Sequence, residues 1–182
     1  YKGIIYITGI KKDTMDMISA YDSSGKLIWD KVYGRAWPNT YPDTRSTPTI
    51  QNDKIYLIGG MGTICCLDAK TGNMIWSQDA HNQFKGEYHR WGIAESVLLT
   101  DQAAICVTGG KVTSVVAYDK ITGKLLWKTK SLGGPRAYAS SSLIERNGLK
   151  IILAQTVNDL IGINSINGEI IWNFNLMQFH LG

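Results

Sequence analysis

The chain has 182 residues, of which 44% are hydrophobic and 19% charged, enough apolar material for a sizeable folded core. Its net charge of +4 comes from Lys and Arg residues scattered singly, which argues against the basic stripe of a nucleic-acid-binding protein. The apolar runs are far shorter than the roughly 18 residues that a membrane helix needs, so no transmembrane segment is expected.

The 19 glycines divide the chain into strand-sized runs and predict many tight turns. The first predicted strand is Gly3–Ile7, and later strands come in pairs. These pairs are Ser46–Gln51 with Lys54–Gly59, Gly92–Leu99 with Ala103–Thr108, and Ala139–Glu145 with Leu149–Ala154. Asn52-Asp53 and Asn147-Gly148 predict the turns within the first and third pairs. Together with the segments described next, the pattern predicts about fifteen strands.

Four segments resemble one another, and each ends in a tryptophan. They are residues 20–29, 66–76, 117–127 and 162–172. Each segment contains a turn residue and then a glycine, and it ends with two apolar residues and the indole. The glycines are Gly25, Gly72, Gly123 and Gly168, and the tryptophans are Trp29, Trp76, Trp127 and Trp172. The glycines recur at intervals of roughly 45 to 50 residues, a period typical of propeller blades built from strands.

The residue types of this repeat have physical reasons. The Asp or Asn that begins the turn accepts backbone N–H bonds, and the glycine adopts the positive φ that closes a short hairpin with a bulge. The residue that opens the motif is always small, which we attribute to an indole lying flat against the backbone; these residues are Ala20, Cys66, Ala117 and Gly162. The strand that ends in the indole is apolar on both faces, which indicates a sheet packed between two neighbouring sheets.

The sequence therefore predicts an all-β fold, a β-propeller of four-stranded antiparallel blades joined through these tryptophans. About four blades are expected within one partial propeller over residues 1–182. Their expected bounds are residues 1–34, 45–80, 91–131 and 136–176. The first blade is expected to lack its innermost strand.

The repeat resembles the tryptophan-docking motif of quinoprotein propellers, Ala-x-Asp-x-x-Thr-Gly-x-x-x-Trp. Residues 117–127 match it throughout, whereas 66–76 differ at the first position, 20–29 are one residue short and 162–172 replace three consensus residues. The chain is similar to the PQQ-like repeat proteins of bacteria, which are related to the outer-membrane β-barrel assembly lipoprotein and to quinoprotein alcohol dehydrogenases. This resemblance implies a ring of seven or eight blades and an extracytoplasmic location, in the periplasm or cell envelope. The remaining blades would belong to a longer chain, of which this is a part, or to a second copy.

A quinoprotein dehydrogenase would need an Asp base, oxygen ligands for Ca²⁺ and a Trp beneath the quinone. This constellation cannot be placed in the sequence. The most regular acidic residues, Asp22, Asp68 and Asp119, are explained as turn residues. We therefore predict no catalytic residue and no cofactor, and PQQ with Ca²⁺ belongs only to the alternative interpretation as a dehydrogenase.

Cysteines and histidines give no stronger signal for a cofactor or metal. Cys65 and Cys66 are adjacent, like the disulfide near the cofactor of some quinoprotein alcohol dehydrogenases. They lie in a predicted strand, where successive side chains point to opposite faces, and a buried structural role is expected. His81, His89 and His180 lack the spacing of metal ligands on one element. No metal site is predicted.

Candidate binding residues lie in the connections that enter the innermost strands, at one mouth of the propeller channel. Arg45, Arg90 and Arg136 recur at comparable points of successive repeats, and converging arginines would suit an anionic ligand or an acidic peptide. The full candidate set is Arg45, Glu87, Tyr88, Arg90, Trp91, Glu95, Arg136 and Tyr138. The alternative is that the arginines form salt bridges and stack on aromatic side chains.

Three functions follow from this pattern. The first is a non-catalytic extracytoplasmic binding or scaffolding propeller that holds a protein or saccharide partner at the channel mouth. The second is a PQQ-dependent alcohol dehydrogenase, with this chain forming part of the cofactor funnel. The third is a purely architectural half-ring that assembles into a closed propeller.

Overall fold

The computed structural model describes residues 1–12, 14–41 and 43–179, and almost all of its regular structure is β. The first sheet consists of β1 (Ile5–Lys11), β2 (Met15–Tyr21) and β3 (Leu27–Arg35). The second consists of β4 (Thr49–Gln51), β5 (Lys54–Ile58), β6 (Thr63–Asp68) and β7 (Met74–Asp79). The third consists of β8 (Leu98–Leu99), β9 (Ala103–Val107), β10 (Val115–Asp119) and β11 (Leu125–Lys128). The fourth consists of β12 (Ser142–Arg146), β13 (Leu149–Gln155), β14 (Asp159–Asn164) and β15 (Ile170–Asn175).

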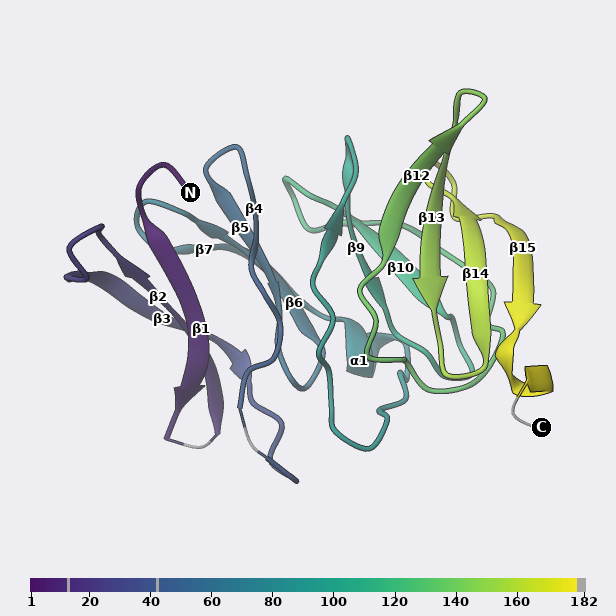
Figure 1. Ribbon diagram of the computed structural model, residues 1–182, viewed down its shortest axis with the longest axis horizontal. Helices are drawn as coiled ribbons and strands as arrows, with labels where there is room; N and C mark the ends of the chain where they lie inside the picture. The colour runs from purple at the N-terminus through teal and green to yellow at the C-terminus, as the bar shows by residue number, and fades with distance from the viewer. Residues whose placement is uncertain (13, 42, 180–182) are drawn as a thin grey trace.

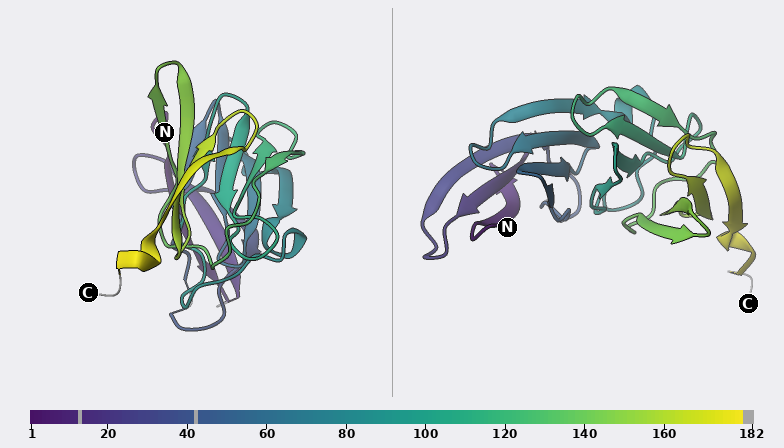
Figure 2. Two further views of the ribbon diagram at one scale, coloured as in Figure 1. Left: turned by 90° about the vertical axis from the view of Figure 1, so that its right-hand side faces the viewer. Right: turned by 90° about the horizontal axis from the view of Figure 1, so that it is seen from above.

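The sheets are antiparallel meanders in chain order, one of three strands followed by three of four strands. They lie side by side along the chain (Figure 1), and from above they follow an open arc with β3, β7, β11 and β15 on its convex side (Figure 2). The predicted partial propeller is confirmed, and the first sheet has three strands as expected. The helical elements are short: α1 (Ala80–Gln83) and the 3-10 turn η1 (Leu176–Phe179). Within the described residues, no helix has the length and apolar character needed to cross a membrane.

The hairpin that closes each repeat has the geometry that its sequence predicts. Asp119 Oδ1, for example, accepts hydrogen bonds from the backbone N–H groups of Ile121 and Thr122 at 3.1 and 2.7 Å. Gly123 follows with φ of +71°, a conformation that a side chain would strain. A register shift between Ala117 and Tyr118 marks the predicted bulge, and the other three repeats have the same shift at the same place.

The tryptophans of the first three repeats contact the hairpin glycine of the next repeat. A Cβ atom on Gly72 would lie 2.7 Å from the Trp29 ring, and one on Gly123 would lie 2.7 Å from the Trp76 ring. The same relation joins Trp127 to Gly168, at 2.5 Å. Only glycine leaves room for an indole at this distance, so the residue that forms the turn also forms the joint between sheets.

The fourth indole and the first glycine have no such partner. Trp172 lies against Gly162, its own cross-strand neighbour, where a Cβ atom would overlap the ring. A Cβ atom on Gly25 would meet no described atom within 4 Å. Each joint therefore has a direction, from the indole of one repeat to the glycine of the following one.

The innermost strands are shorter than the sequence predicted. Pairing begins at Thr49, Leu98 and Ser142, several residues after the predicted starts. Some of the residues before them form hydrogen bonds to the neighbouring inner segment. The Thr47 N–H donates to Ser96 Oγ at 3.3 Å, and the Ser96 N–H donates to Ser140 Oγ at 2.9 Å. These bonds connect successive blades along the concave side of the arc.

Candidate functional site

Long connections after β3, after β7 and after β11 lead to the inner strands, and the first two lie along the lower edge of Figure 1. Side chains of all three connections line one hollow of about 440 Å³, which we call the rim hollow. Its lining residues are Tyr41, Arg45, Trp91, Ala94 and Tyr138. Tyr41 is 81% exposed and Trp91 is 41% exposed. Large aromatic surfaces in water are unusual and often mark a binding surface.

Tyr138 fixes the aromatic side of the rim hollow. Its hydroxyl lies 2.7 Å from His89 Nδ1 and accepts a hydrogen bond from the Trp91 N–H at 2.8 Å. The Trp91 and Tyr138 rings lie 5.5 Å apart, with their planes tilted by 33°. The third blade's connection is therefore held to that of the fourth blade, and the indole is oriented before any partner arrives.

The arginines of the rim hollow have different roles. The Arg45 Nη1 donates to the Trp91 carbonyl at 2.7 Å, and Nη2 donates to the carbonyls of Thr40 and Tyr41. Within the described residues, Arg45 bonds to neutral carbonyls and forms no ion pair. The Arg90 guanidinium lies 5.5 Å from the centre of the Trp91 ring, in cation–π geometry. The hollow is therefore aromatic with a cationic border.

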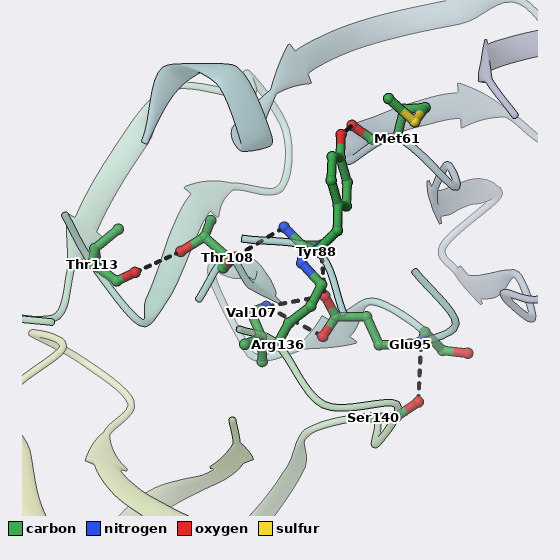
Figure 3. A network of polar contacts seen from close by, with 9 residues as sticks. Met61, Tyr88, Glu95, Val107, Thr108, Thr113, Arg136 and Ser140 are labelled. Carbon is green, nitrogen blue, oxygen red and sulfur yellow. Dashed lines mark hydrogen bonds and ion pairs between the residues drawn. The ribbon is translucent and has the colours of Figure 1, made fainter. Parts of the chain in front are cut away.

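Arg136 does not reach this hollow, because it is buried together with Glu95. Arg136 is 0% and Glu95 is 1% exposed. Figure 3 shows the Glu95 carboxylate between Arg136 and Val107: its nearest approach to Nη1 is 3.6 Å, and both oxygens accept from the Val107 N–H at 3.2 Å. Arg136 Nη2 donates to the Thr108 carbonyl at 3.2 Å. The pair joins the third and fourth blades behind the rim hollow.

Burial dominates the electrostatics of this pair. It raises the pKa of Glu95 to about 7, although Arg136 and the Val107 N–H oppose the shift. Burial outweighs the charge of Arg136, which approaches the carboxylate only to 3.6 Å. Within the described residues, Nε and Nη1 of Arg136 have no hydrogen-bond partner. Glu95 is thus a carboxyl group that titrates near neutral pH inside the protein.

The predicted site residues therefore fall into two groups. Arg45, Trp91 and Tyr138 line the rim hollow, and Arg90 lies over the Trp91 ring. Glu95 and Arg136 form a buried pair that does not line it. Glu87 contributes its carbonyl, which accepts from the Arg136 N–H at 3.3 Å. Tyr88 faces the other way: its hydroxyl donates to the Met61 carbonyl at 2.9 Å (Figure 3), and its ring stacks on His81 at 3.7 Å.

Sequence reasoning did not select Tyr41 or the contact between His81 and Tyr88. Tyr41 lies in an irregular connection whose course no periodicity predicts. His81 was considered only as a metal ligand, and its position in a one-turn helix has no pattern of its own. The sequence offered one signal for Tyr41: it is an aromatic residue in a connection that is predicted to lie at the channel mouth.

The metal-binding side chains of the described residues do not gather at one place. Within the described ranges, no three His, Cys, Asp or Glu side chains come together as metal ligands; His180 lies outside them. Cys65, Cys66 and Cys106 are free and buried. Burial raises the pKa of the Cys66 thiol to about 11, and Cys66 pairs across the strands with Trp76, where other repeats have Ala or Gly.

Residues 14–180 match the family model described as outer membrane protein assembly factor BamB. The chain belongs to this family. It is 21% identical to the assembly factor BamB of Kangiella koreensis over 98% of this chain and 42% of that protein. It is also 25% identical to the quinoprotein alcohol dehydrogenase PedH of Pseudomonas putida, over 76% of this chain and 24% of that enzyme. The chain thus spans less than half the length of these curated relatives.

Solved structures show the same fold. The quinohemoprotein alcohol dehydrogenase of Comamonas testosteroni superimposes with a TM-score of 0.66 at 16% identity, over 95% of this chain and 33% of that one. BamB of Moraxella catarrhalis superimposes with a TM-score of 0.61 at 18% identity, over 92% of this chain and 50% of that one. The resemblance inferred from the repeat is confirmed. Both an assembly factor and dehydrogenases share this fold, so the fold does not distinguish between their functions.

Proposed function

We propose that this chain is part of a non-catalytic, extracytoplasmic propeller that binds a protein partner at the rim hollow, in a role related to outer membrane protein assembly. The observation that supports the proposal is the rim hollow itself, which exposes Tyr41 and Trp91 next to two arginines. Aromatic residues and arginine are the residue types enriched at the centres of protein interfaces.

The preorganisation of the hollow supports a binding role. Tyr138 and Arg45 each use hydrogen bonds to fix the backbone of Trp91, so this connection has less backbone entropy to lose on binding. Arg45 and Arg90 favour a partner with acidic groups beside an apolar side chain. A saccharide, which also stacks on aromatic rings, is the alternative occupant.

We further propose that other blades complete the ring. Trp172 lacks the glycine of a following repeat, and Gly25 lacks the indole of a preceding one. Those blades would belong to the same polypeptide or to a second copy of this chain. The mass of the purified protein in solution distinguishes the two: a monomer excludes closure by a second copy.

Photo-crosslinking in intact cells tests the binding proposal. A benzophenone amino acid replaces Tyr41 in the full-length protein, and a control variant has it at Ile166, which is 82% exposed in the β14–β15 hairpin. We expect protein adducts at position 41 that are absent at position 166 and that decrease at least fivefold when Trp91→Ala is added. Equal adducts at both positions, or adducts unaffected by W91A, would refute the proposal. Adducts removed by glycosidase would reassign the hollow to a saccharide.

The similarity to quinoprotein alcohol dehydrogenases supports the alternative function. It is tested by adding PQQ and Ca²⁺ to the full-length protein and measuring cofactor binding and dye-linked alcohol oxidation. Tight binding with turnover would replace the proposed non-catalytic role.

A further inference from the structure

A second hollow, of about 290 Å³, lies beside α1 and shares no lining residue with the rim hollow. We call it the α1 pocket. The lining residues that matter here are Arg35, Met61, Asp79, His81, Asn82 and Tyr88. They come from the ends of β3 and β7, the β5–β6 connection, α1 and the segment after it, so the pocket lies where the first two sheets meet the helix.

The wall of this pocket depends on a glycine. Gly62 has φ of +88°, and a Cβ atom there would lie 2.6 Å from the Cβ of His81. A side chain at this position would push α1 away from the β5–β6 connection. His81 is also held from the other side, because its ring stacks on Tyr88 at 3.7 Å with an interplanar angle of 12°. The imidazole therefore has a fixed orientation.

Arg35 gives the pocket a free positive charge. Its guanidinium is exposed, and within the described ranges it forms no hydrogen bond and no ion pair. Asp79 is the acidic lining residue, and it is already engaged at the start of α1. Its Oδ1 accepts from the Asn82 N–H at 3.0 Å, and its Oδ2 accepts from the Asn82 side chain at 2.7 Å.

His81 contributes a hydrogen-bond donor. Burial, followed by the charge of Arg136, lowers the pKa of His81, so its ring is neutral at pH 7 and has a single N–H. Its Nδ1 is buried, and no described residue forms a hydrogen bond to it. A Cβ atom on Gly86 would lie 3.0 Å from this nitrogen and 3.3 Å from Arg136 Nη2, so both groups lie beside Gly86. The charge of Arg136 acts on the imidazole from this side. A neighbouring cation favours a lone pair on Nδ1, which places the proton on Nε2.

We propose that the α1 pocket binds a carboxylate, with Arg35 donating two hydrogen bonds and the Nε2–H of His81 donating a third. A guanidinium matches both oxygens of a carboxylate, and the pocket otherwise offers the Met61 side chain and the Tyr88 ring to a small apolar body. Its volume suits a ligand of amino-acid size. The carboxylate belongs either to a free small acid or to the C-terminus of a peptide. This site is separate from the rim hollow, and its test does not depend on the proposed function.

Calorimetric titration of the full-length protein with N-acetylglycine tests the proposal, with N-acetylglycinamide as the uncharged counterpart. We expect the acid to bind and the amide to bind at least tenfold more weakly. Arg35→Gln should lower the affinity for the acid about ten- to a hundredfold, the range expected for charge-assisted hydrogen bonds. The matched control is Arg146→Gln, another exposed arginine without an ion pair in the described residues, which should leave the affinity unchanged.

A nitrogen NMR spectrum of His81 provides a readout that does not depend on affinity. It should show the Nε2–H tautomer in the free protein and a shift of Nε2 when N-acetylglycine is added. Equal binding of acid and amide, equal affinities of R35Q and R146Q, or an Nδ1–H tautomer would each overturn the proposal. A tripeptide ending in glycine that binds at least tenfold more tightly assigns the site to a peptide C-terminus. Equal affinity assigns it to a free acid, and both results support a carboxylate site.

Discussion

Glu95→Gln should stabilise the protein at pH 8 and have little effect at pH 5. The pKa of Glu95 is raised from 4.5 to about 7, so between these values the folded protein holds a proton that the unfolded chain has lost. Stability therefore falls as pH rises through this window, by about 3 kcal/mol in total. Glutamine is neutral throughout and keeps one oxygen for the Val107 N–H, so E95Q avoids this loss. Allowing about 1 kcal/mol for the second hydrogen bond, E95Q should exceed the wild type by about 2 kcal/mol at pH 8.

Urea denaturation at pH 5 and pH 8, followed by tryptophan fluorescence, measures this difference. The matched control is Glu145→Gln, on an exposed residue of β12, for which the two pH values should give the same change. Arg136→Met should have the opposite sign at pH 8, with a loss of about 1–3 kcal/mol, because it removes the cation beside Glu95 and the donor to the Thr108 carbonyl. If E95Q proves less stable than the wild type at pH 8 by more than at pH 5, the ion pair outweighs the burial of Glu95 and the reasoning is wrong.

Three further outcomes are expected. Gly123→Ala should cost about 2–5 kcal/mol of unfolding free energy, from backbone strain and overlap with Trp76, whereas Gly25→Ala should cost only the strain, about 1–2 kcal/mol; thermal denaturation of both variants checks the contrast. Tyr138→Phe removes the hydroxyl that fixes the rim hollow, so crosslinking at position 41 should fall while the melting temperature changes by only a few degrees. Cys66 should resist iodoacetamide at pH 8 until urea unfolds the protein, since its buried thiol has a pKa of about 11; mass spectrometry of the labelled peptide would reveal early modification, contrary to this expectation.

Sequence reasoning predicted the fold well because the decisive interactions are local. An Asp that accepts backbone N–H groups, a glycine with positive φ and a bulge all lie within about ten residues of each indole. Once this hairpin recurs at a regular interval, the sheets and their order follow. The inner strands were predicted too long because their first residues bond to the neighbouring inner segment, which a single repeat does not reveal.

The candidate site was predicted only in part. The structure places three of the candidate residues, Arg45, Trp91 and Tyr138, at one hollow, and their role in binding stays a prediction. The spacing of the arginines did not show that Arg136 is buried while Arg45 and Arg90 are not. Its burial depends on a contact with Glu95, which lies 41 positions earlier in the chain. Contacts between irregular segments of different repeats have no periodic signal, and the α1 pocket escaped the sequence for the same reason.

The one-way joint between an indole and the next glycine has a consequence for how such arrays evolve and unfold. Every internal boundary uses the same two elements in the same polarity, so a repeat can be gained or lost in a single genetic step without inventing a new interface. The free energy of unfolding should then increase with each added boundary between blades. Replacing one of these glycines should destabilise the boundary between two adjacent blades, while distant blades keep their own contacts.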